Sequence, residues 1–244
     1  TIPDKTYKLI LSLLRATSWP IQSRKAVPGR GACLGCTYGG KDPFIGPYTR
    51  HCEQMVRVIN NMVWKQISQP NLVKNHPDVP LYCWSSLQIN YNTVSKKHTD
   101  SNNVGLSYIF TLGDFTGGEV VIPSMGVGNI VKGLALAFDG TKEHWSGEFT
   151  GERYSIVVFC HDQHARLSEK DREYLTDLGF RLPPVPHALV VADKRDKEVV
   201  DVPSYPAKLT PVSFYKANGC FIDIRTLFEA LCEPGGYHYV TYGI

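Results

Sequence analysis

The sequence lacks the features that mark membrane, fibrous and disordered proteins. Its longest apolar runs, such as residues 156–160, are far shorter than the roughly 18 residues that a membrane-spanning helix needs. It contains no internal repeat and no low-complexity tract. Hydrophobic residues make up 43% of the chain and charged residues 20%, which is ordinary globular usage and excludes collagen, coiled coils and disordered chains. We therefore expect a folded protein with no membrane partner.

A long apolar segment is also missing from the first twenty residues, which carry charges at Asp4, Lys5, Lys8 and Arg15. A signal peptide is therefore not expected. Seven cysteines, an odd number scattered along the chain, do not form the pattern of a disulfide framework and favour a reducing compartment. We expect an intracellular protein, nuclear in a eukaryote. At 244 residues, we expect one compact domain and a monomer.

The net charge of +3 is small, but the charge is distributed unevenly. Residues 1–66 hold ten Lys and Arg and three acids, a balance of +7, so the rest of the chain carries −4. A basic N-terminal third is typical of a protein that binds a polyanion. A solvated basic surface would give the same count.

Cys33 and Cys36 form a CxxC pair within a glycine-rich stretch. A zinc site needs further ligands at suitable spacing, and only His51 and Cys52 lie nearby. The pattern therefore fits a glycine-rich turn with two unpaired thiols, with a zinc site as the alternative.

The N-terminal third is predicted to contain helices and loops. Apolar residues at helical spacing predict helices over residues 4–16 and 49–67. Residues 28–48, rich in Gly and Pro, predict a structured loop, and Pro70 and Pro80 bracket another loop.

From Trp84 onward the pattern changes to β, with short runs separated by glycine-rich turns. Strands are predicted over residues 87–91, 107–112, 119–122, 134–138 and 154–160. Short strands at this spacing favour a sandwich or barrel.

Helical pattern returns after the β region. Residues 168–178 predict a helix with Ser168 as N-cap, residues 181–211 are Pro-rich, and residues 222–231 predict an amphipathic helix.

The pattern as a whole predicts an α+β protein with a mainly β core. We expect an N-terminal helical and basic extension (1–83), a β core that carries the chemistry (84–164) and a C-terminal extension (165–244), packed as one compact unit.

Three residues of the β core are candidate metal ligands. His98 and Asp100 are separated by one residue, so on an extended segment they point the same way and can reach one metal ion. His144 follows the predicted strand 134–138 and its turn, and supplies a third ligand. Two His and one carboxylate leave open positions, as in non-haem Fe(II) oxygenases. Taken alone, His-x-Asp is common in structural and surface pairs.

Arg153 lies nine residues after His144, at the start of the last predicted strand. An arginine that points into a barrel is costly to bury unless it meets an anion. Ser155 shares its face of the strand, so the two could bind a carboxylate through a guanidinium fork and a hydroxyl. The alternative is an arginine at the surface end of a strand.

Residues 84–164 resemble the 2-oxoglutarate and Fe(II)-dependent dioxygenase superfamily, whose fold is the double-stranded β-helix or jelly roll. The resemblance rests on the stretches HTDSNNVGLSYIFTLGDFTGGEVVIP, GLALAFDG and EHWSGEFTGERYSIVVFCH. It implies a jelly-roll core with N-terminal helices and a C-terminal helical extension.

The same resemblance assigns roles to the candidate residues. It implies that His98, Asp100 and His144 hold Fe(II). It implies that Arg153, with Ser155, binds the distal carboxylate of 2-oxoglutarate. Oxidative decarboxylation of this cosubstrate to succinate and CO₂ would then drive oxidation of a C–H bond of the substrate.

Three further positions look like the TET/JBP branch, whose members modify nucleobases. Asn103 falls three residues after Asp100, His161 falls eight after Arg153, and Phe159 falls two before His161. In that branch such residues hydrogen-bond the flipped pyrimidine and stack on it. The resemblance implies a double-stranded DNA partner that contains a methylated pyrimidine.

The physics of base modification fits these positions. A base must leave the duplex before its C5-methyl group can be oxidised, and it then needs an aromatic face and hydrogen-bond partners. Lys96 and Lys97, just before the metal ligands, could hold adjacent phosphates. Each residue also has a plain structural reading: Phe159 as a core aromatic, Asn103 as a turn residue and His161 as a strand terminus.

The chain departs from the TET pattern in one respect. The long Cys-rich zinc region that flanks animal TET catalytic domains is absent, and only Cys33 and Cys36 faintly resemble it. Some algal relatives use ascorbate in place of 2-oxoglutarate. Arg153 and Ser155 favour 2-oxoglutarate here, with ascorbate as a reductant or an alternative cosubstrate.

A second ligand-rich stretch, His161-Asp162-Gln163-His164, could hold a separate metal or could be a polar strand exit. No distant partner of suitable context accompanies it.

Three hypotheses follow. The first is a dioxygenase that oxidises 5-methylcytosine in DNA to 5-hydroxymethylcytosine and beyond, with thymine as the nearest variant. The second is a protein or small-molecule hydroxylase of the same superfamily, which leaves Asn103, Phe159 and His161 unexplained. The third is a nucleic-acid-binding module on a decayed jelly roll, against which the intact ligand set argues.

Overall fold

The computed structural model describes residues 1–67, 83–123, 126–128 and 132–185. Its helices are α1 (Asp4–Ala16), α2 (Pro47–His51), α3 (Glu53–Ile67) and α5 (Glu169–Asp177), with a 3₁₀ turn η1 (Asp162–Arg166). Its strands are β1 (Arg30–Tyr38), β2 (Pro43–Ile45), β3 (Ser86–Tyr91), β4 (Asn103–Gly117), β5 (Val120–Ile122), β6 (Gly126–Gly128), β7 (Leu136–Phe138), β8 (Trp145–Ser146) and β9 (Phe149–His161).

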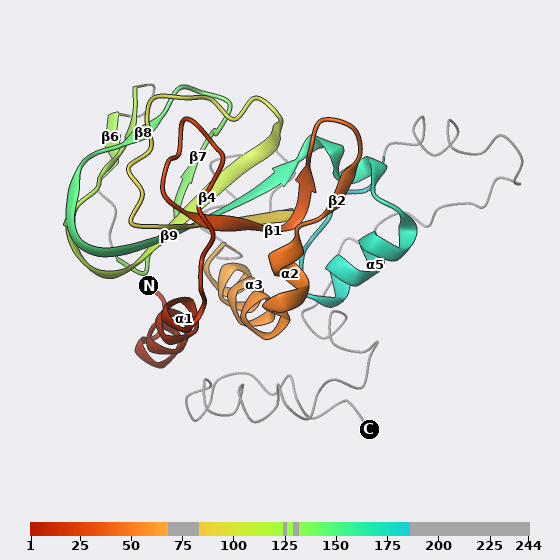
Figure 1. Ribbon diagram of the computed structural model, residues 1–244, viewed down its shortest axis with the longest axis horizontal. Coiled ribbons are helices and arrows are strands. Elements are labelled where there is room, and N and C mark those ends of the chain that lie inside the picture. The colour runs from red at the N-terminus through yellow and green to blue at the C-terminus, as the bar shows by residue number, and fades with distance from the viewer. Residues whose placement is uncertain (68–82, 124–125, 129–131, 186–244) are drawn as a thin grey trace, which may run out of the picture.

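The strands form two antiparallel sheets (Figure 1). The larger has the order β2-β1-β3-β9-β4-β7, and the smaller has the order β6-β5-β8. The last strand in the described part of the chain, β9, therefore lies in the middle of the larger sheet, between β3 and β4. The expected α+β fold with a mainly β core is confirmed.

Side-chain alternation gives the two faces of the larger sheet opposite characters. Ile89 of β3 pairs with Ile156 of β9, and both are fully buried in the main hydrophobic cluster. The next pair, Asn90 and Ser155, points to the other face, because successive residues of a strand project to opposite sides. One face is thus apolar, and the other presents polar groups to the interior of the fold.

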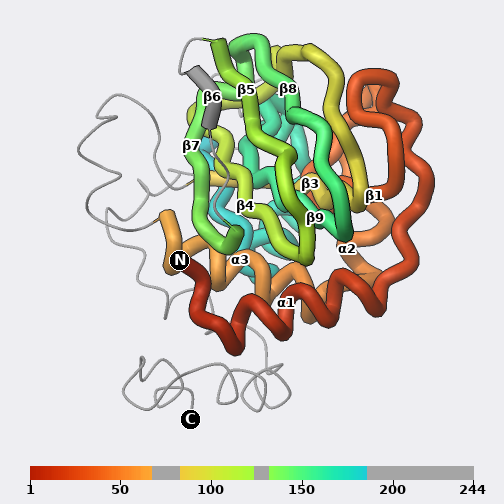
Figure 2. The backbone as a smooth tube through the Cα atoms, turned by 90° about the vertical axis from the view of Figure 1, so that its left-hand side faces the viewer, coloured from red at the N-terminus to blue at the C-terminus, as the bar shows by residue number. Residues whose placement is uncertain are grey.

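Helices cover the apolar face (Figures 1 and 2). Ile10 and Leu14 of α1 and Ile59 and Val63 of α3 are fully buried in the same cluster as the sheet residues. The smaller sheet lies on the other side, where a second apolar cluster with Ile109 joins it to the larger sheet. The polar face of the larger sheet is consequently enclosed.

The helix predictions within the described residues are confirmed. Residues 4–16 form α1, and residues 49–67 correspond to α2 and α3, which are separated at Cys52. Helix α5 begins after Ser168, whose hydroxyl accepts a hydrogen bond from the backbone N–H of Asp171. All five predicted strands are present, although β4 and β9 are longer than predicted.

The predicted loop over residues 28–48 is wrong, because this stretch contains strands β1 and β2 and the start of α2. Two of its glycines, Gly31 and Gly35, serve close packing of strands, whereas Gly40 lies in the connection between β1 and β2. A Cβ atom on Gly31 would lie 2.0 Å from the carbonyl oxygen of Ile89, and one on Gly35 would lie 2.3 Å from that of Ser85. Strand β1 can pair with β3 only where these side chains are missing.

Several predictions concern residues outside the described ranges. These are the loop bracketed by Pro70 and Pro80, the helix over residues 222–231 and most of the Pro-rich stretch 181–211. The division into three parts stays a prediction. None of the described helices has the length and apolar character needed to cross a membrane.

Asn60 provides a test of how the helices are joined to the sheet. It is buried, accepts a hydrogen bond from Trp84 Nε1 (2.8 Å) and donates one to the carbonyl oxygen of Leu178 (2.8 Å). Asn60→Ala leaves both partners unsatisfied and should lower the free energy of unfolding by about 2–4 kcal/mol, measured by urea denaturation. The neighbouring Asn61→Ala serves as the control and should change it by less than about 0.5 kcal/mol. Equal effects of the two variants would contradict the assignment.

Candidate active site

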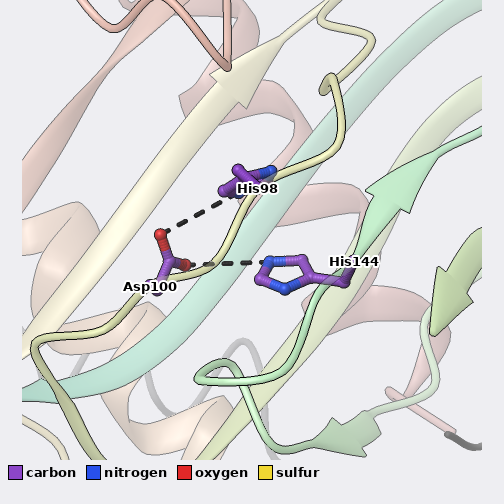
Figure 3. A group of neighbouring side chains, drawn as sticks. All are labelled: His98, Asp100 and His144. Carbon is purple, nitrogen blue, oxygen red and sulfur yellow. Dashed lines mark ion pairs between the residues drawn. The ribbon is translucent and has the colours of Figure 1, made fainter. Parts of the chain in front are cut away.

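His98 and His144 are brought together by backbone pairing. The two residues form an isolated antiparallel bridge, in which His98 N–H donates to the His144 carbonyl (3.1 Å) and His144 N–H donates to the His98 carbonyl (2.9 Å). Asp100 N–H donates to the carbonyl of Gly140, which fixes the segment beyond (2.9 Å). Backbone hydrogen bonds thus hold the His98–Asp100 segment beside His144, which follows it by 44 positions or more in the sequence. Figure 3 shows Asp100 facing both imidazoles.

The three side chains form a group that could hold a metal ion. Nε2 of His98 lies 3.9 Å from Asp100 Oδ1, Nε2 of His144 lies 3.8 Å from Asp100 Oδ2, and the three ligand atoms lie within 4.8 Å of one another. Among the described residues this is the one such group. The predicted ligand set therefore converges in space.

The outer partners of the histidines set their tautomers. Nδ1 of His98 lies 2.6 Å from the carbonyl oxygen of Lys96, and Nδ1 of His144 lies 2.8 Å from that of Lys142. A carbonyl only accepts, so Nδ1 carries the proton and the Nε2 lone pair is free for a metal. Burial lowers the pKa of His144, which favours the neutral form that ligates.

A cavity of about 630 Å³ adjoins this group. Ligand pockets usually fall between about 300 and 1,000 Å³. Every second residue of β9 lines it, namely Arg153, Ser155, Val157, Phe159 and His161. Strand alternation thus places the predicted anion-binding pair and two of the predicted base-reading residues on one wall.

Arg153 is a buried cation that forms no ion pair in the described part of the chain, although the Glu119 carboxylate is near enough to act on its charge. It is 2% exposed, its Nε has no hydrogen-bond partner, and its other nitrogens make only long contacts to the carbonyls of Thr93 (3.4 Å) and Gly118 (3.3 Å). No carboxylate forms an ion pair with it in the described part of the chain. Burial lowers its pKa to about 10, so it stays charged at neutral pH. A guanidinium buried in this way is costly in free energy unless an anionic ligand binds beside it.

Asn103 and His161 are direct neighbours, as paired residues of β4 and β9. Asn103 Nδ2 donates to Ser107 Oγ (3.2 Å), which leaves its Oδ1 as an acceptor. Half-buried Phe159 lies on the same wall as His161. The structure thus gathers the three predicted base-reading residues around one cavity.

Lys96 and Lys97 are exposed and do not line the cavity. Lys97 forms an ion pair with Glu143 (3.0 Å) and lies over the Trp145 ring, 5.0 Å from its centroid. A role in holding phosphates stays a prediction for both.

The alternative metal groups do not form among the described residues. His164 is buried beside Arg172, away from the cavity lining, and burial and that cation lower its pKa to about 4. Cys33 and Cys36 lie on strand β1 rather than in a turn, and burial raises their pKa values to about 11 and about 12. Neither thiol joins a metal-binding group with other described residues.

Sequence reasoning missed the segment between α1 and β1. Arg24 Nη2 donates to Asp100 Oδ1 (3.0 Å), and Gln22 Nε2 donates to Asn90 Oδ1 (3.0 Å). Both residues line the cavity, as does Tyr38, whose ring centroid lies 5.8 Å from that of His161. The basic N-terminal third gave a general signal for Arg24, but no motif pointed to the amides.

Among solved structures, the chain is similar to NgTET1 in complex with 5mC DNA, with a TM-score of 0.50 and 17% identity over 66% of this chain and 70% of that chain. The fold is a double-stranded β-helix. Weaker likenesses are to an oxidoreductase of the 2OG-Fe(II) oxygenase family from Burkholderia pseudomallei (TM-score 0.45, 17% identity, 66% and 81% covered) and to OsALKBH1 (0.39, 11%, 65% and 96%). No protein-family model and no curated protein matches the chain.

Likeness at this level of identity establishes the fold alone. The expected jelly roll with N-terminal helices is confirmed within the described residues. The chemistry of the site rests on the residues and distances given above.

Removal of any one ligand should abolish metal binding. His98→Ala, Asp100→Ala and His144→Ala should each weaken Mn(II) affinity by more than about 100-fold, because loss of a mere outer-shell partner already costs about 10–100-fold. Calorimetric titration with Mn(II) measures this, and circular dichroism checks that each variant is folded. His51→Ala, which removes an exposed histidine of α2, should bind like the wild type. Full stoichiometric binding by His144→Ala would refute the assignment.

Proposed function

We propose that the protein is an Fe(II)- and 2-oxoglutarate-dependent dioxygenase that oxidises the C5-methyl group of a flipped pyrimidine, 5-methylcytosine in DNA. The observation that carries the proposal is Arg153, a buried cation with no ion pair among the described residues and an unpartnered Nε, in the same cavity as the His98, Asp100 and His144 group. A metal ion held by these three ligands and chelated by a keto acid, whose distal carboxylate contacts Arg153, would account for both the ligand group and the buried cation.

The residues present fit these two groups. His98 and His144 would each donate an Nε2 lone pair, and Asp100 would donate a carboxylate oxygen, which is the ligand set favoured by non-haem Fe(II). Arg153 and Ser155 would bind the distal carboxylate. When bound, Fe(II), 2-oxoglutarate and O₂ together supply the oxidation of an unactivated C–H bond. The protein's part is to orient the substrate methyl group and exclude water.

The protonation of His161 supports a role in reading a base. The backbone N–H of Gln163 points at its Nδ1 (3.1 Å), and Asp162 Oδ1 lies 2.9 Å from the same nitrogen. The Gln163 N–H fits a neutral ring with its proton on Nε2, whereas the Asp162 carboxylate fits a proton on Nδ1, and we propose the first form for the base-reading ring. Burial lowers the pKa of His161, which favours the neutral ring. Nε2–H is a donor suited to the O2 atom of a pyrimidine.

Asn103 supports cytosine over thymine. Because its Nδ2 is bonded to Ser107, its Oδ1 is left to accept a hydrogen bond. Cytosine offers an exocyclic amino donor, whereas thymine offers a carbonyl at the same position. Phe159 would stack on the ring. The likeness to a structure solved with 5mC DNA is consistent with this choice.

Exposed cations on the segments that lead to and follow β1 support a nucleic-acid partner. Arg24, Lys25 and Lys41 are exposed on the segments before β1 and between β1 and β2. Lys96 adds a further exposed cation. In the proposal these exposed side chains contact backbone phosphates, and binding should therefore weaken steeply as salt rises. We propose a double-stranded DNA substrate, acted on by a monomer.

Mass spectrometry of nucleosides tests this function. We expect the protein to act on methylated duplex DNA in the presence of Fe(II), ascorbate and 2-oxoglutarate. The nucleosides recovered from the DNA should then show 5-methyldeoxycytidine converted to 5-hydroxymethyldeoxycytidine. Omission of 2-oxoglutarate should abolish turnover, whereas turnover with ascorbate alone would indicate the alternative cosubstrate. Product from thymine but not 5-methylcytosine would reverse the base assignment. Succinate formation with no nucleoside product would favour a hydroxylase of another substrate class.

Arg153→Ala should raise the 2-oxoglutarate concentration needed for half-maximal turnover by about 100-fold or more, because a bidentate charge-assisted contact is lost from a buried site. Steady-state kinetics with varied 2-oxoglutarate measure the change. Arg15→Ala, which removes an exposed arginine of α1 that pairs with Glu152, is the control. An unchanged requirement in Arg153→Ala would show that the anion binds elsewhere.

A further inference from the structure

Ser155 has a polar neighbour that the proposed chemistry does not yet use. Asn90 lies directly across from it in the β3–β9 pairing, and its Nδ2 donates to Ser155 Oγ (3.3 Å). Asn90 is 7% exposed and Ser155 is 4% exposed. Both line the cavity, so the contact is buried beside the predicted carboxylate site.

The orientation of the Asn90 amide is fixed by two other amides. Its Oδ1 accepts from Nε2 of Gln22 (3.0 Å) and lies 3.3 Å from Nε2 of Gln88, whose two protons also face the carbonyl of Ile89 at 2.9 Å. Gln88 also donates to Gln22 Oε1 (3.1 Å), which closes a ring of three side chains. Because its oxygen accepts from Gln22, Asn90 presents its NH₂ group to Ser155.

This orientation decides what the serine hydroxyl does. Ser155 Oγ already accepts a hydrogen bond from Asn90, so its proton is free to be donated into the cavity. The donors then point in one direction, from Gln22 through Asn90 to Ser155. Each hydrogen bond in such a chain polarises the next, which strengthens donation to an anion at its end.

The backbone is shaped to admit Gln22. Gly31 of β1 pairs with Asn90, and a Cβ atom at Gly31 would lie 2.7 Å from Nε2 of Gln22 and 2.0 Å from the Ile89 carbonyl. Gln22 comes from the segment between α1 and β1, outside the strands of the larger sheet. The absence of a side chain at Gly31 therefore leaves room for the Gln22 amide beside the closely paired strands β1 and β3.

We propose that Asn90 and Gln22 are positioning residues that set the Ser155 hydroxyl as a hydrogen-bond donor to the distal carboxylate of the cosubstrate. The inference rests on the proposed function, because it takes 2-oxoglutarate as the anion bound by Arg153 and Ser155. It adds two amide residues, one of them outside the β core, to the determinants of cosubstrate affinity.

Binding of 2-oxoglutarate to the Mn(II)-loaded full chain, measured by calorimetry without nucleic acid, tests the proposal. Asn90→Ala should weaken binding by about tenfold, the usual effect of losing support for a hydrogen bond to a charged group. Asn90→Asp should weaken it by about 30-fold or more, because the new carboxylate accepts the Ser155 proton and repels the ligand. Mn(II) affinity should not change in either variant.

A double-mutant cycle separates positioning from general destabilisation. If Asn90 acts through the hydroxyl, Asn90→Ala should cost less than about twofold further in a Ser155→Ala background. Gln22→Ala, a change outside the larger sheet, should weaken 2-oxoglutarate binding by about threefold and serves where Asn90 variants do not fold. Gln66→Ala, which alters an exposed amide of α3, is the matched control and should bind like the wild type.

The outcomes distinguish a failure of the proposed function from a failure of the inference about Asn90 and Gln22. If the wild type binds Mn(II) but no 2-oxoglutarate, the proposed function fails and the inference with it. If the wild type binds 2-oxoglutarate and Asn90→Asp and Gln22→Ala bind equally well, the inference fails and the proposed function stands. Additive losses in the double-mutant cycle would also overturn it, because Asn90 would then not act through Ser155.

Discussion

The two-residue alternation of strands β3 and β9 is the constraint on which the rest of the molecule depends. Ile89 and Ile156 turn toward the helices, so Asn90 and Ser155 must turn the other way. A shift of the register by one residue would bury the polar set under the helices and leave the apolar set in the cavity. The burial of apolar side chains under α1 and α3 therefore also fixes the polar wall of the site.

Charge is the second constraint. Arg153 gives up hydration on entering the fold and receives only long carbonyl contacts and the faces of Phe115 and Phe149 in return. Arg153 does not stabilise the fold, since an apolar side chain of similar size could be buried at a lower cost in free energy. This burial, in the same cavity as a group of metal-ligand type, is why we propose that an anion binds there.

The sequence was most informative where local spacing determines geometry. The His-x-Asp spacing and the shared strand face of Arg153 and Ser155 required no knowledge of distant contacts, and both were predicted. The pairing of Asn103 with His161 and the amide ring at Asn90 depend on which strands become neighbours, which spacing does not reveal. Gly31 and Gly35 misled because a glycine in a turn and a glycine at a close strand approach look alike in sequence.

The central place of β9 has a consequence for how the chain is made. Its partners β3 and β4 are synthesised first, yet each keeps an unpaired edge until residues 149–161 leave the ribosome. The nascent polypeptide thus carries an open edge on β3 from the synthesis of Tyr91 until β9 is made, a condition that invites misassembly. Any truncated product that stops before Phe149 would lack the strand that joins the two halves of the large sheet, and would depend on chaperones or be degraded.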